Sequence, residues 1–492
     1  MCFIGIEYSH VLLSVLSSSF FRPCSFIIST VADEDLDVMI GMEIHVPLKT
    51  QRKLFCDCPI NYWDVEEPNL NTCPVCTGMP GSKPYPLNEG AVEAAVMIAE
   101  LLECEIARDN VFVKRKHYDY PDLPSGYQRT SEPIGVEGRV GDVGIWEVHL
   151  EEDPGRYDLK TGNVDYNRSG VPLIEIVSAP DMKGPAEVRD FMRELVNILR
   201  YSERVVDVGG VMRADVNISI KGGAKVEIKN INSVAGAFKA LQYEIIRQKN
   251  MMARGAVVRQ ETRGFDEKTQ VTRPQRVKET AADYRYIPDP DIPPQHFTEE
   301  YTASIELPET PQLRRKRLIE EYGVREDYAQ TMVRDKDIAD LFEEVKGGVG
   351  VELASMWICR EVLRQLNYRS IDLRESKLSA AIMVELLKLL ESDEITENVG
   401  KKLLERVIDS GESPSKIVEE ERLGRVSGEG ELSSVVDEVI GENVKAVADY
   451  KSGEKTALNF LMGAVMKKMR GRADSKVVLE LLGRRLDDDS GR

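Results

Sequence analysis

The stretch VMIGMEIHV, residues 38–46, alternates apolar residues with Glu43 and His45 in its second half. Side chains of a β-strand point alternately to its two faces, so Glu43 and His45 share one face. Ile40, Met42 and Ile44 share the other face, which is suited to a core. The stretch therefore predicts a strand with one packed face and one face that carries ionisable groups.

Further strand-like segments carry carboxylates in the same way: HLEED at 149–153, PLIEIV at 172–177, ADVNISI at 214–220 and KVEIK at 225–229. Clustered carboxylates are costly unless an opposite charge lies close to them. Hard divalent cations prefer oxygen ligands, so the pattern indicates a metal and phosphate site on a sheet. A single Glu of this kind could be an ordinary ion-paired or edge-strand residue. That explanation weakens when the segments are taken together.

Cysteines form a second pattern. Four of the eight stand in two close pairs, Cys56 with Cys58 and Cys73 with Cys76. A CxC pair followed by a CxxC pair suits a structural zinc ion held by four thiolates. Four buried free thiols are the alternative. Such pairs in a long chain also favour metal binding over disulfides, and hence a reducing cytoplasm.

Composition excludes some classes of protein. A net charge of −19 argues against a protein that coats nucleic acid without specificity. No apolar stretch is long enough to cross a membrane, and no P-loop or GxSxG motif occurs. Residues 441–486 nevertheless hold ten Lys and Arg against five Asp and Glu. This excess indicates nucleic-acid contact by a small helical module, unless it only solvates a helix face.

The chain divides by composition into several parts, since 492 residues exceed one core. Residues 1–35 are an unassigned extension without the basic start of a signal peptide. Residues 36–297 predict an α+β domain built largely on antiparallel sheet, with helices at 88–102, 185–201 and 235–249. Residues 298–410 predict a helical domain, and 415–492 a small helical tail.

Taken together, these motifs resemble the GatB family, the B subunits of aspartyl/glutamyl-tRNA(Asn/Gln) amidotransferases, of the archaeal type. The segments that carry the resemblance are IGMEIHV 40–46, YPDLPSGYQ 120–128, HLEEDPG 149–155, DYNRSGVPLIEIV 165–177, RADVNIS 213–219, EIKNINS 227–233, QETRGFD 260–266, DYRY 283–286, ADYKSGEK 448–455 and FLMG 460–463. These are long motifs in the family's order, and residues 1–35 lie outside them.

The resemblance implies a catalytic cradle, a helical domain and a YqeY-like tail. Members of the family use ATP and Mg²⁺ to phosphorylate the side-chain carboxylate of Glu or Asp mischarged on tRNA(Gln) or tRNA(Asn). The partner amidase GatA releases ammonia from glutamine, and a tunnel leads this ammonia to the cradle. There the ammonia displaces the phosphate. GatC is a small third subunit. The expected protein is thus part of a glutamine-hydrolysing ligase of protein biosynthesis, with no membrane association.

The resemblance also implies roles for residues. The family's metal ligands fall on Glu43, His45, Glu152, Glu175, Asp215 and Glu227. Glu151 is a neighbouring candidate, and Asp153 is expected to contact the ligands rather than the metal. Asn217, Lys229 and Asn230 are expected to position phosphates or substrate. Lys467, Lys468 and Arg470 of the tail are expected to hold tRNA.

Some features depart from the family pattern. Residues 127–131 read YQRTS where bacterial relatives often read YQISQ, which leaves the polar contacts along the tunnel open. Several relatives lack the cysteine pairs, so zinc would support the fold rather than the chemistry. The related GatE carries a large inserted domain for which this chain has no room. Two other functions remain as alternatives: a non-catalytic, zinc-containing tRNA-binding scaffold and a metal-dependent phosphohydrolase.

Overall fold

The fold is seen in a computed structural model, which describes residues 37–206, 212–276, 285–369, 371–426, 428–454 and 456–488. The extension expected at residues 1–35, two residues of the DYRY motif and Lys455 lie outside the described residues. The side chain of Asn230 also lies outside them, although its backbone belongs to a strand.

A twelve-stranded sheet forms the N-terminal part of the fold, in the order β13-β12-β11-β10-β1-β9-β6-β4-β3-β14, with β5 paired to β6 and β2 to β5. Only β11 and β12 among its pairs run parallel. The expected α+β fold on a largely antiparallel sheet is therefore confirmed. Its strands are β1 (Val38–Pro47), β2 (Glu105–Ile106), β3 (Val113–His117), β4 (Tyr127–Ser131), β5 (Gly135–Val140), β6 (Val143–Glu152), β9 (Pro172–Ser178), β10 (Arg213–Ile220), β11 (Val226–Ile231), β12 (Glu261–Asp266), β13 (Val271–Arg276) and β14 (Arg285–Pro288).

The sheet core follows from the alternation seen in β1. Ile40, Met42 and Ile44 are at most 1% exposed, whereas Glu43 and His45 are partly exposed on the opposite face. The neighbouring strands β9 and β10 alternate in register with β1, so their buried apolar residues cover the same face. Strand pairing thus gathers the ionisable side chains of three strands on one surface.

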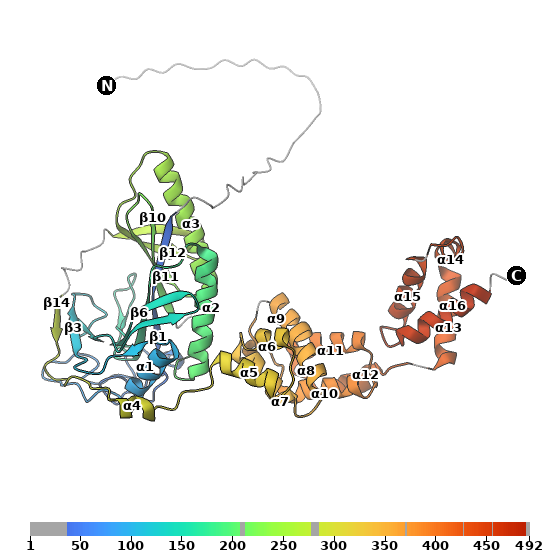
Figure 1. The fold of residues 1–492 in the computed structure, drawn as a ribbon, viewed down its shortest axis with the longest axis horizontal. Coiled ribbons are helices and arrows are strands. Elements are labelled where there is room, and N and C mark those ends of the chain that lie inside the picture. Colours follow the sequence, from blue (N-terminus) through green and yellow to red (C-terminus); the bar gives the residue numbers. More distant parts are fainter. Residues whose placement is uncertain are drawn as a thin grey trace, which may run out of the picture. The chain divides into compact units, whose positions relative to one another are not determined.

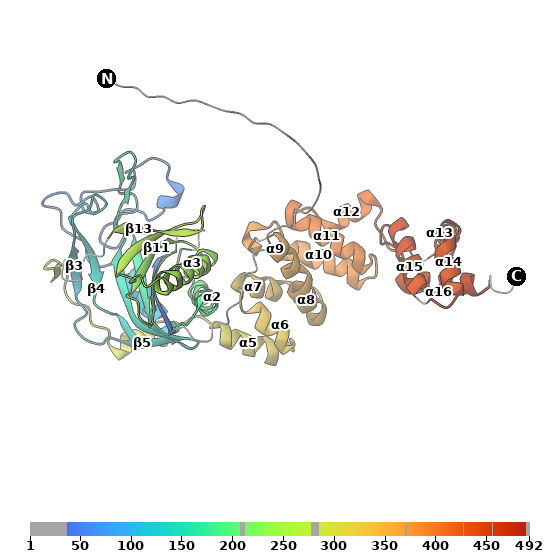
Figure 2. The ribbon, with the colours of Figure 1, turned by 90° about the horizontal axis from the view of Figure 1, so that it is seen from above.

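Three long helices accompany the sheet: α1 (Glu89–Leu101), α2 (Pro185–Ser202) and α3 (Val234–Ala253). Helices α2 and α3 pack side by side, and α3 lies against β10, β11 and β13 (Figures 1 and 2). Asn88 and Ser233 cap α1 and α3 by accepting hydrogen bonds from backbone N–H groups. Helix α3 continues beyond the predicted residue 249, because good helix formers extend until Gly255 adopts a positive φ.

Smaller elements complete this part: the 3₁₀ turn η1 (Tyr62–Asp64), the two-stranded sheet of β7 (Arg156–Tyr157) and β8 (Val164–Asp165), and α4 (Glu299–Ser304). Thr302 of α4 accepts a 3.0 Å hydrogen bond from Arg108 Nη1. We therefore propose that this domain includes α4, slightly past the boundary predicted at residue 297.

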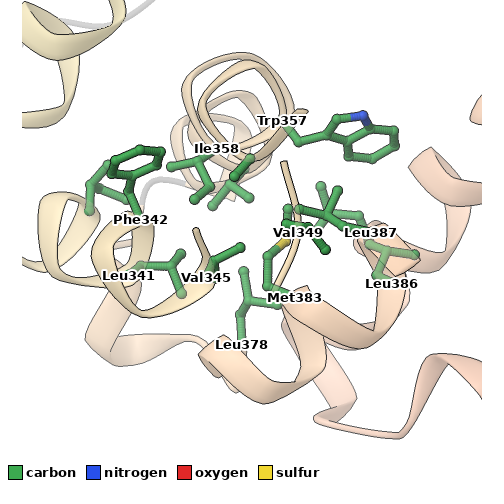
Figure 3. Packing of buried hydrophobic residues seen from close by; sticks show 14 of the residues in the cluster. Leu341, Phe342, Val345, Val349, Trp357, Ile358, Leu378, Met383, Leu386 and Leu387 are labelled. Carbon is green, nitrogen blue, oxygen red and sulfur yellow. The ribbon is translucent and has the colours of Figure 1, made fainter. Parts of the chain in front are cut away.

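A helical region follows, with a core of its own. Figure 3 shows Phe342 and Val345 of α7 and Met383 and Leu387 of α10 within this core, close to Trp357. Its elements are α5 (Pro311–Glu320), α6 (Glu326–Met332), α7 (Lys336–Val345), α8 (Val351–Trp357), the π-helical turn η3 (Ile358–Val362), α9 (Leu363–Arg369), the 3₁₀ turn η4 (Leu373–Glu375), α10 (Ala380–Glu391), α11 (Glu397–Ser410) and α12 (Pro414–Glu421).

A second helical core is formed by α13 (Glu429–Glu442), α14 (Val444–Lys451), α15 (Thr456–Lys468) and α16 (Ser475–Asp488). Leu432, Val436, Leu461 and Leu482 are fully buried in it. Ile417 of α12 belongs to the preceding core instead. We therefore propose that the tail starts after α12 rather than at residue 415. Within the described ranges, no helix has both the length and the apolar character needed for a membrane span.

Candidate functional site

Strand β1 carries the centre of the site because it lies between β9 and β10. Glu43 stands opposite Asp215 of β10, and His45 stands opposite Glu175 of β9. Glu227 of β11 stands opposite Asn217, one strand further along. The sheet therefore brings together most of the residues that the sequence predicted as metal ligands.

One group of possible ligands consists of His45, Glu151 and Glu175, whose ligand atoms lie within 4.8 Å of one another. His45 Nε2 lies 3.5 Å from Glu151 Oε2 and 3.5 Å from Glu175 Oε1. Burial opposes the charged imidazole, but the two carboxylates outweigh it and raise the pKa of His45 to about 10. Burial likewise disfavours the Glu175 carboxylate, yet His45 lowers the pKa of Glu175 to about 2.

A second group consists of Glu43, Asp215 and Glu227, again with ligand atoms within 4.8 Å of one another. Lys229 Nζ lies 2.6 Å from Asp215 Oδ2 and 3.2 Å from Glu227 Oε1. Burial, and then three neighbouring carboxylates led by Glu175, raise the pKa of Glu43 above its ordinary value. One ammonium thus faces a group of carboxylates that repel one another.

Strand alternation places Lys229 at this group, because Lys229 follows Glu227 by two residues and shares its face. Val216 pairs with Ile228 and Ala214 with Ile231, so β11 holds one residue more than β10 over this interval. Bulges turn side chains away from the regular alternation and are frequent beside active sites. Here the bulge lies beside Asp215, which Lys229 contacts.

Asn217 offers evidence that the site is built for a ligand. Its Nδ2 donates a 3.0 Å hydrogen bond to Glu43 Oε1, whereas its Oδ1 is buried and finds no hydrogen-bond partner among the described residues. A buried, unsatisfied carbonyl oxygen is costly and needs an explanation. The carboxylates, this amide oxygen and the imidazole are oxygen and nitrogen donors suited to Mg²⁺ and its water or phosphate ligands.

Glu152 lies apart from both groups, although the sequence grouped it with them. Its Oε1 accepts a 2.9 Å hydrogen bond from the Arg129 backbone N–H and lies 3.3 Å from Arg129 Nη1. Burial raises the pKa of Glu152, and the Arg129 charge opposes this. The structure therefore brings Glu151, rather than Glu152, to His45. Asp153 is buried and binds Arg213 Nη2 at 2.8 Å.

The four cysteines meet as the two pairs predicted. The Sγ atoms of Cys56, Cys58, Cys73 and Cys76 all lie within 4.8 Å of one another. The backbone N–H of Cys73 donates to Cys76 Sγ at 3.2 Å. A hydrogen bond from Cys56 lowers the pKa of Cys76 to about 5. Four converging sulfur atoms with N–H donors suit a tetrahedral zinc ion.

In the tail, all three predicted tRNA-binding side chains are exposed on or just after α15. Lys468 Nζ lies 2.8 Å from both Glu438 and Glu442 of α13. Its charge is therefore already balanced, whereas no ion pair of Lys467 occurs among the described residues. The three positions differ in how much positive charge they offer to an anion.

Comparison with known proteins now gives the family. The family profile described as the GatB/GatE catalytic domain matches residues 38–303, and the profile described as the GatB domain matches residues 340–486. The chain belongs to the GatB family. Its match to the catalytic-domain profile contains every candidate metal ligand on the sheet and all four paired cysteines.

Several GatB relatives cover nearly the same length as this chain. The protein of Methanopyrus kandleri is 52% identical over 460 residues, which is 92% of this chain and 99% of that protein. The proteins of Methanocaldococcus jannaschii and Methanothermobacter thermautotrophicus are 51% and 49% identical, over 92% and 91% of this chain and 99% of each relative. All three are named as the B subunit of aspartyl/glutamyl-tRNA(Asn/Gln) amidotransferase.

Sequence reasoning on this GatB chain missed three polar residues beside the predicted ones. Thr262 donates a 3.0 Å hydrogen bond to Glu227 Oε2, Arg129 binds Glu152, and Lys53 Nζ donates to Cys76 Sγ at 3.5 Å. Thr262 reaches the site through the parallel pairing of β11 with β12, which strand patterns do not reveal. The QETRGFD motif that contains Thr262 was the available signal.

Proposed function

We propose that this chain activates the side-chain carboxylate of Glu-tRNA(Gln), Asp-tRNA(Asn) or both, as the B subunit of a tRNA-dependent amidotransferase. A carboxylate oxygen attacks the γ-phosphorus of ATP, the bond to ADP breaks, and an acyl phosphate forms. Ammonia then attacks the acyl carbon, phosphate leaves, a proton is lost, and the amide of Gln-tRNA(Gln) or Asn-tRNA(Asn) results. The names of the relatives and their coverage of the chain support this reaction.

The observation that carries the proposal is the pair of adjacent ligand groups on one sheet face, His45–Glu151–Glu175 and Glu43–Asp215–Glu227. Each group would hold Mg²⁺ through its carboxylates, and the His45 imidazole would complete the first. Bound Mg²⁺ neutralises phosphate charge, which a reaction between a carboxylate and a phosphate requires. ATP can use such a site without a Walker loop, which the sequence lacks.

The chain's own residues supply positioning and charge. Lys229 lies against Asp215 and Glu227, so its ammonium keeps a positive charge at the edge of the acidic face. Asn217 fixes the Glu43 carboxylate, and its buried Oδ1, which has no partner in the described part of the chain, is available to a ligand. We propose that Asn217, Lys229 and Asn230 orient the phosphates or the substrate carboxylate. Preorganised charges of this kind lower the barrier because they need no rearrangement during the reaction.

Other roles follow the same proposal. The four cysteines would hold a structural Zn²⁺ that fixes the loop segments around them. Lys467, Lys468 and Arg470 would contact tRNA phosphates. An amidase of the GatA type would supply ammonia, and a small subunit of the GatC type would complete the complex.

An amidation assay of the complete complex tests the proposal. The complex is given ATP, Mg²⁺, glutamine and each mischarged tRNA, with Glu43→Gln as the variant and the exposed strand residue Glu105→Gln as the matched control. We expect Glu43→Gln to lose tRNA-dependent ATP hydrolysis and amidation by roughly a hundredfold or more. Glutamine hydrolysis by the partner and tRNA binding should continue.

Other results would assign a different function. If Glu43→Gln retains tRNA-dependent ATP hydrolysis, the kinase assignment is wrong. ATP hydrolysis that tRNA does not stimulate in the wild-type complex would favour a phosphohydrolase. Binding of tRNA without amidation of either mischarged species would favour the non-catalytic scaffold.

A further inference from the structure

Lys53 is a completely buried cation beside the four cysteines. Its relative exposure is 0%, the lowest value for any lysine in the described core. Its Nζ donates to Asn71 O at 2.8 Å, to Tyr166 O at 3.2 Å and to Cys76 Sγ at 3.5 Å. The three N–H groups of the ammonium are therefore satisfied.

The charge of Lys53 needs an anion as well. Within the described part of the chain, no Asp or Glu forms an ion pair with it, and carbonyl oxygens carry no net charge. A buried ammonium without an opposite charge is strongly disfavoured. The remaining contact is Cys76 Sγ, which belongs to the group of four sulfur atoms. The anion that balances Lys53 is therefore thiolate sulfur.

Lys53 also ties the two cysteine pairs together. Its backbone N–H donates to Cys58 O at 2.9 Å, within the CxC pair, while its side chain reaches Cys76 of the CxxC pair. Gly170, whose φ of +83° favours glycine, lies against the Lys53 and Cys76 side chains. Lys53 thus occupies one fixed place beside the cluster.

We propose that Lys53 is the built-in counter-charge of a zinc tetrathiolate, an inference that rests on the zinc site proposed above. Four thiolates around Zn²⁺ carry a net charge of −2, which a buried position tolerates poorly. The Lys53 ammonium lowers this to −1 and donates an N–H to one of the ligands. Groups that contact metal ligands in this way set metal affinity as well as ligand orientation.

Zinc affinity of the full-length chain tests this inference. Lys53→Met keeps most of the aliphatic stem and removes the charge, and Lys83→Met is the matched control, since Lys83 is exposed and pairs with Asp291. Zinc content is measured by elemental analysis and affinity by competition with a chromophoric chelator. We expect Lys53→Met to bind zinc roughly tenfold or more weakly than wild type. Lys83→Met should bind like wild type.

A second background separates charge from packing. In Cys76→His a neutral imidazole replaces one thiolate, so the zinc site needs less counter-charge. Adding Lys53→Met there should weaken zinc binding by only about threefold or less, because the two changes are coupled through charge. If Lys53→Met alone does not fold, the effect of Lys53→Met on zinc affinity is measured in the Cys76→His background instead.

Several results would overturn the inference. Equal zinc affinities for Lys53→Met and Lys83→Met would show that the charge of Lys53 does not affect zinc binding. Equal losses in both backgrounds would show that Lys53 acts only through packing. A wild-type chain without zinc would overturn this inference and the zinc site together. None of these measurements uses ATP or tRNA, so failure of the proposed amidotransferase function would appear separately, in the amidation assay.

Discussion

His45 of β1 stands directly opposite Glu175 of β9, and its Nε2 lies 3.5 Å from Glu175 Oε1. The antiparallel register alone brings the two side chains to the same face of adjacent strands. Glu151 of β6 approaches the same nitrogen from the other side of β9. One imidazole is thereby placed between two carboxylates, an arrangement that holds a proton when no metal is bound and offers three ligand atoms when one is.

This relationship predicts how stability of the metal-free protein depends on pH. The pKa of His45 is raised from 6.5 to about 10, so its contribution is complete below pH 6.5 and is lost as the pH rises through 10. The pKa of Glu175 is lowered from 4.5 to about 2, so its contribution is complete above pH 4.5 and is lost as the pH falls toward 2. The pair stabilises fully only between these limits.

We therefore expect His45→Gln to destabilise the chelator-treated protein by about 2 kcal/mol near pH 6. The difference in unfolding free energy between His45→Gln and wild type should shrink steadily as the pH rises toward the His45 pKa of about 10. Urea unfolding at a series of pH values measures it, with the exposed His296→Gln as a control that should change little at any pH. A difference that stays constant into the alkaline range would contradict the assignment.

Lys229 gives a prediction about the second ligand group. Lys229→Met leaves Asp215 and Glu227 without their ammonium, so we expect tRNA-dependent ATP hydrolysis to fall by roughly a hundredfold. Lys229→Arg keeps the charge and should lose much less. Lys239→Met, an exposed lysine of α3, serves as the control. Steady-state ATP hydrolysis with saturating mischarged tRNA is the measurement, and equal rates for both Lys229 variants would refute a charge role.

Much of this site could be predicted from sequence because strand alternation is local. The acidic faces of β1 and β9 follow from the two-residue period alone, and the cysteine pairs follow from their spacing. Two features depend on contacts between distant segments. The choice between Glu151 and Glu152 depends on the pairing of β6 with β9, which puts Glu151 on the same face as Glu175, and the contact of Thr262 with Glu227 depends on the parallel pairing of β11 with β12. A one-residue shift of register reverses the face of every side chain, so sequence could not decide either.

Arg129 contacts neither of the two ligand groups, but we expect its substitution to have a large effect on stability. Its side chain is 7% exposed, and its guanidinium contacts Glu152 at 3.3 Å and the fully buried Asp289 at 2.8 Å. Arg129→Met leaves Glu152 without an ionic partner among the described residues and Asp289 with Arg115 alone, so we expect a loss of about 3 kcal/mol in the free energy of unfolding. The exposed pair of Lys83 with Asp291 provides the comparison, and Lys83→Met should leave the urea midpoint unchanged. An Arg129→Met midpoint equal to that of Lys83→Met would show that the buried network is dispensable.

The tail residues predict unequal contributions to tRNA affinity. Lys468 is held by Glu438 and Glu442, whereas Lys467 on the preceding position of α15 is exposed and has no ion pair among the described residues. A lysine that contacts a phosphate releases a counterion, so Lys467→Gln should weaken binding and reduce the salt dependence by about one ion. Lys468→Gln should cost less than half as much free energy, because its carboxylate partners already offset its charge. Titrations of labelled tRNA at several salt concentrations measure both effects. Identical salt slopes for wild type and Lys467→Gln would place the tRNA contact elsewhere on the chain.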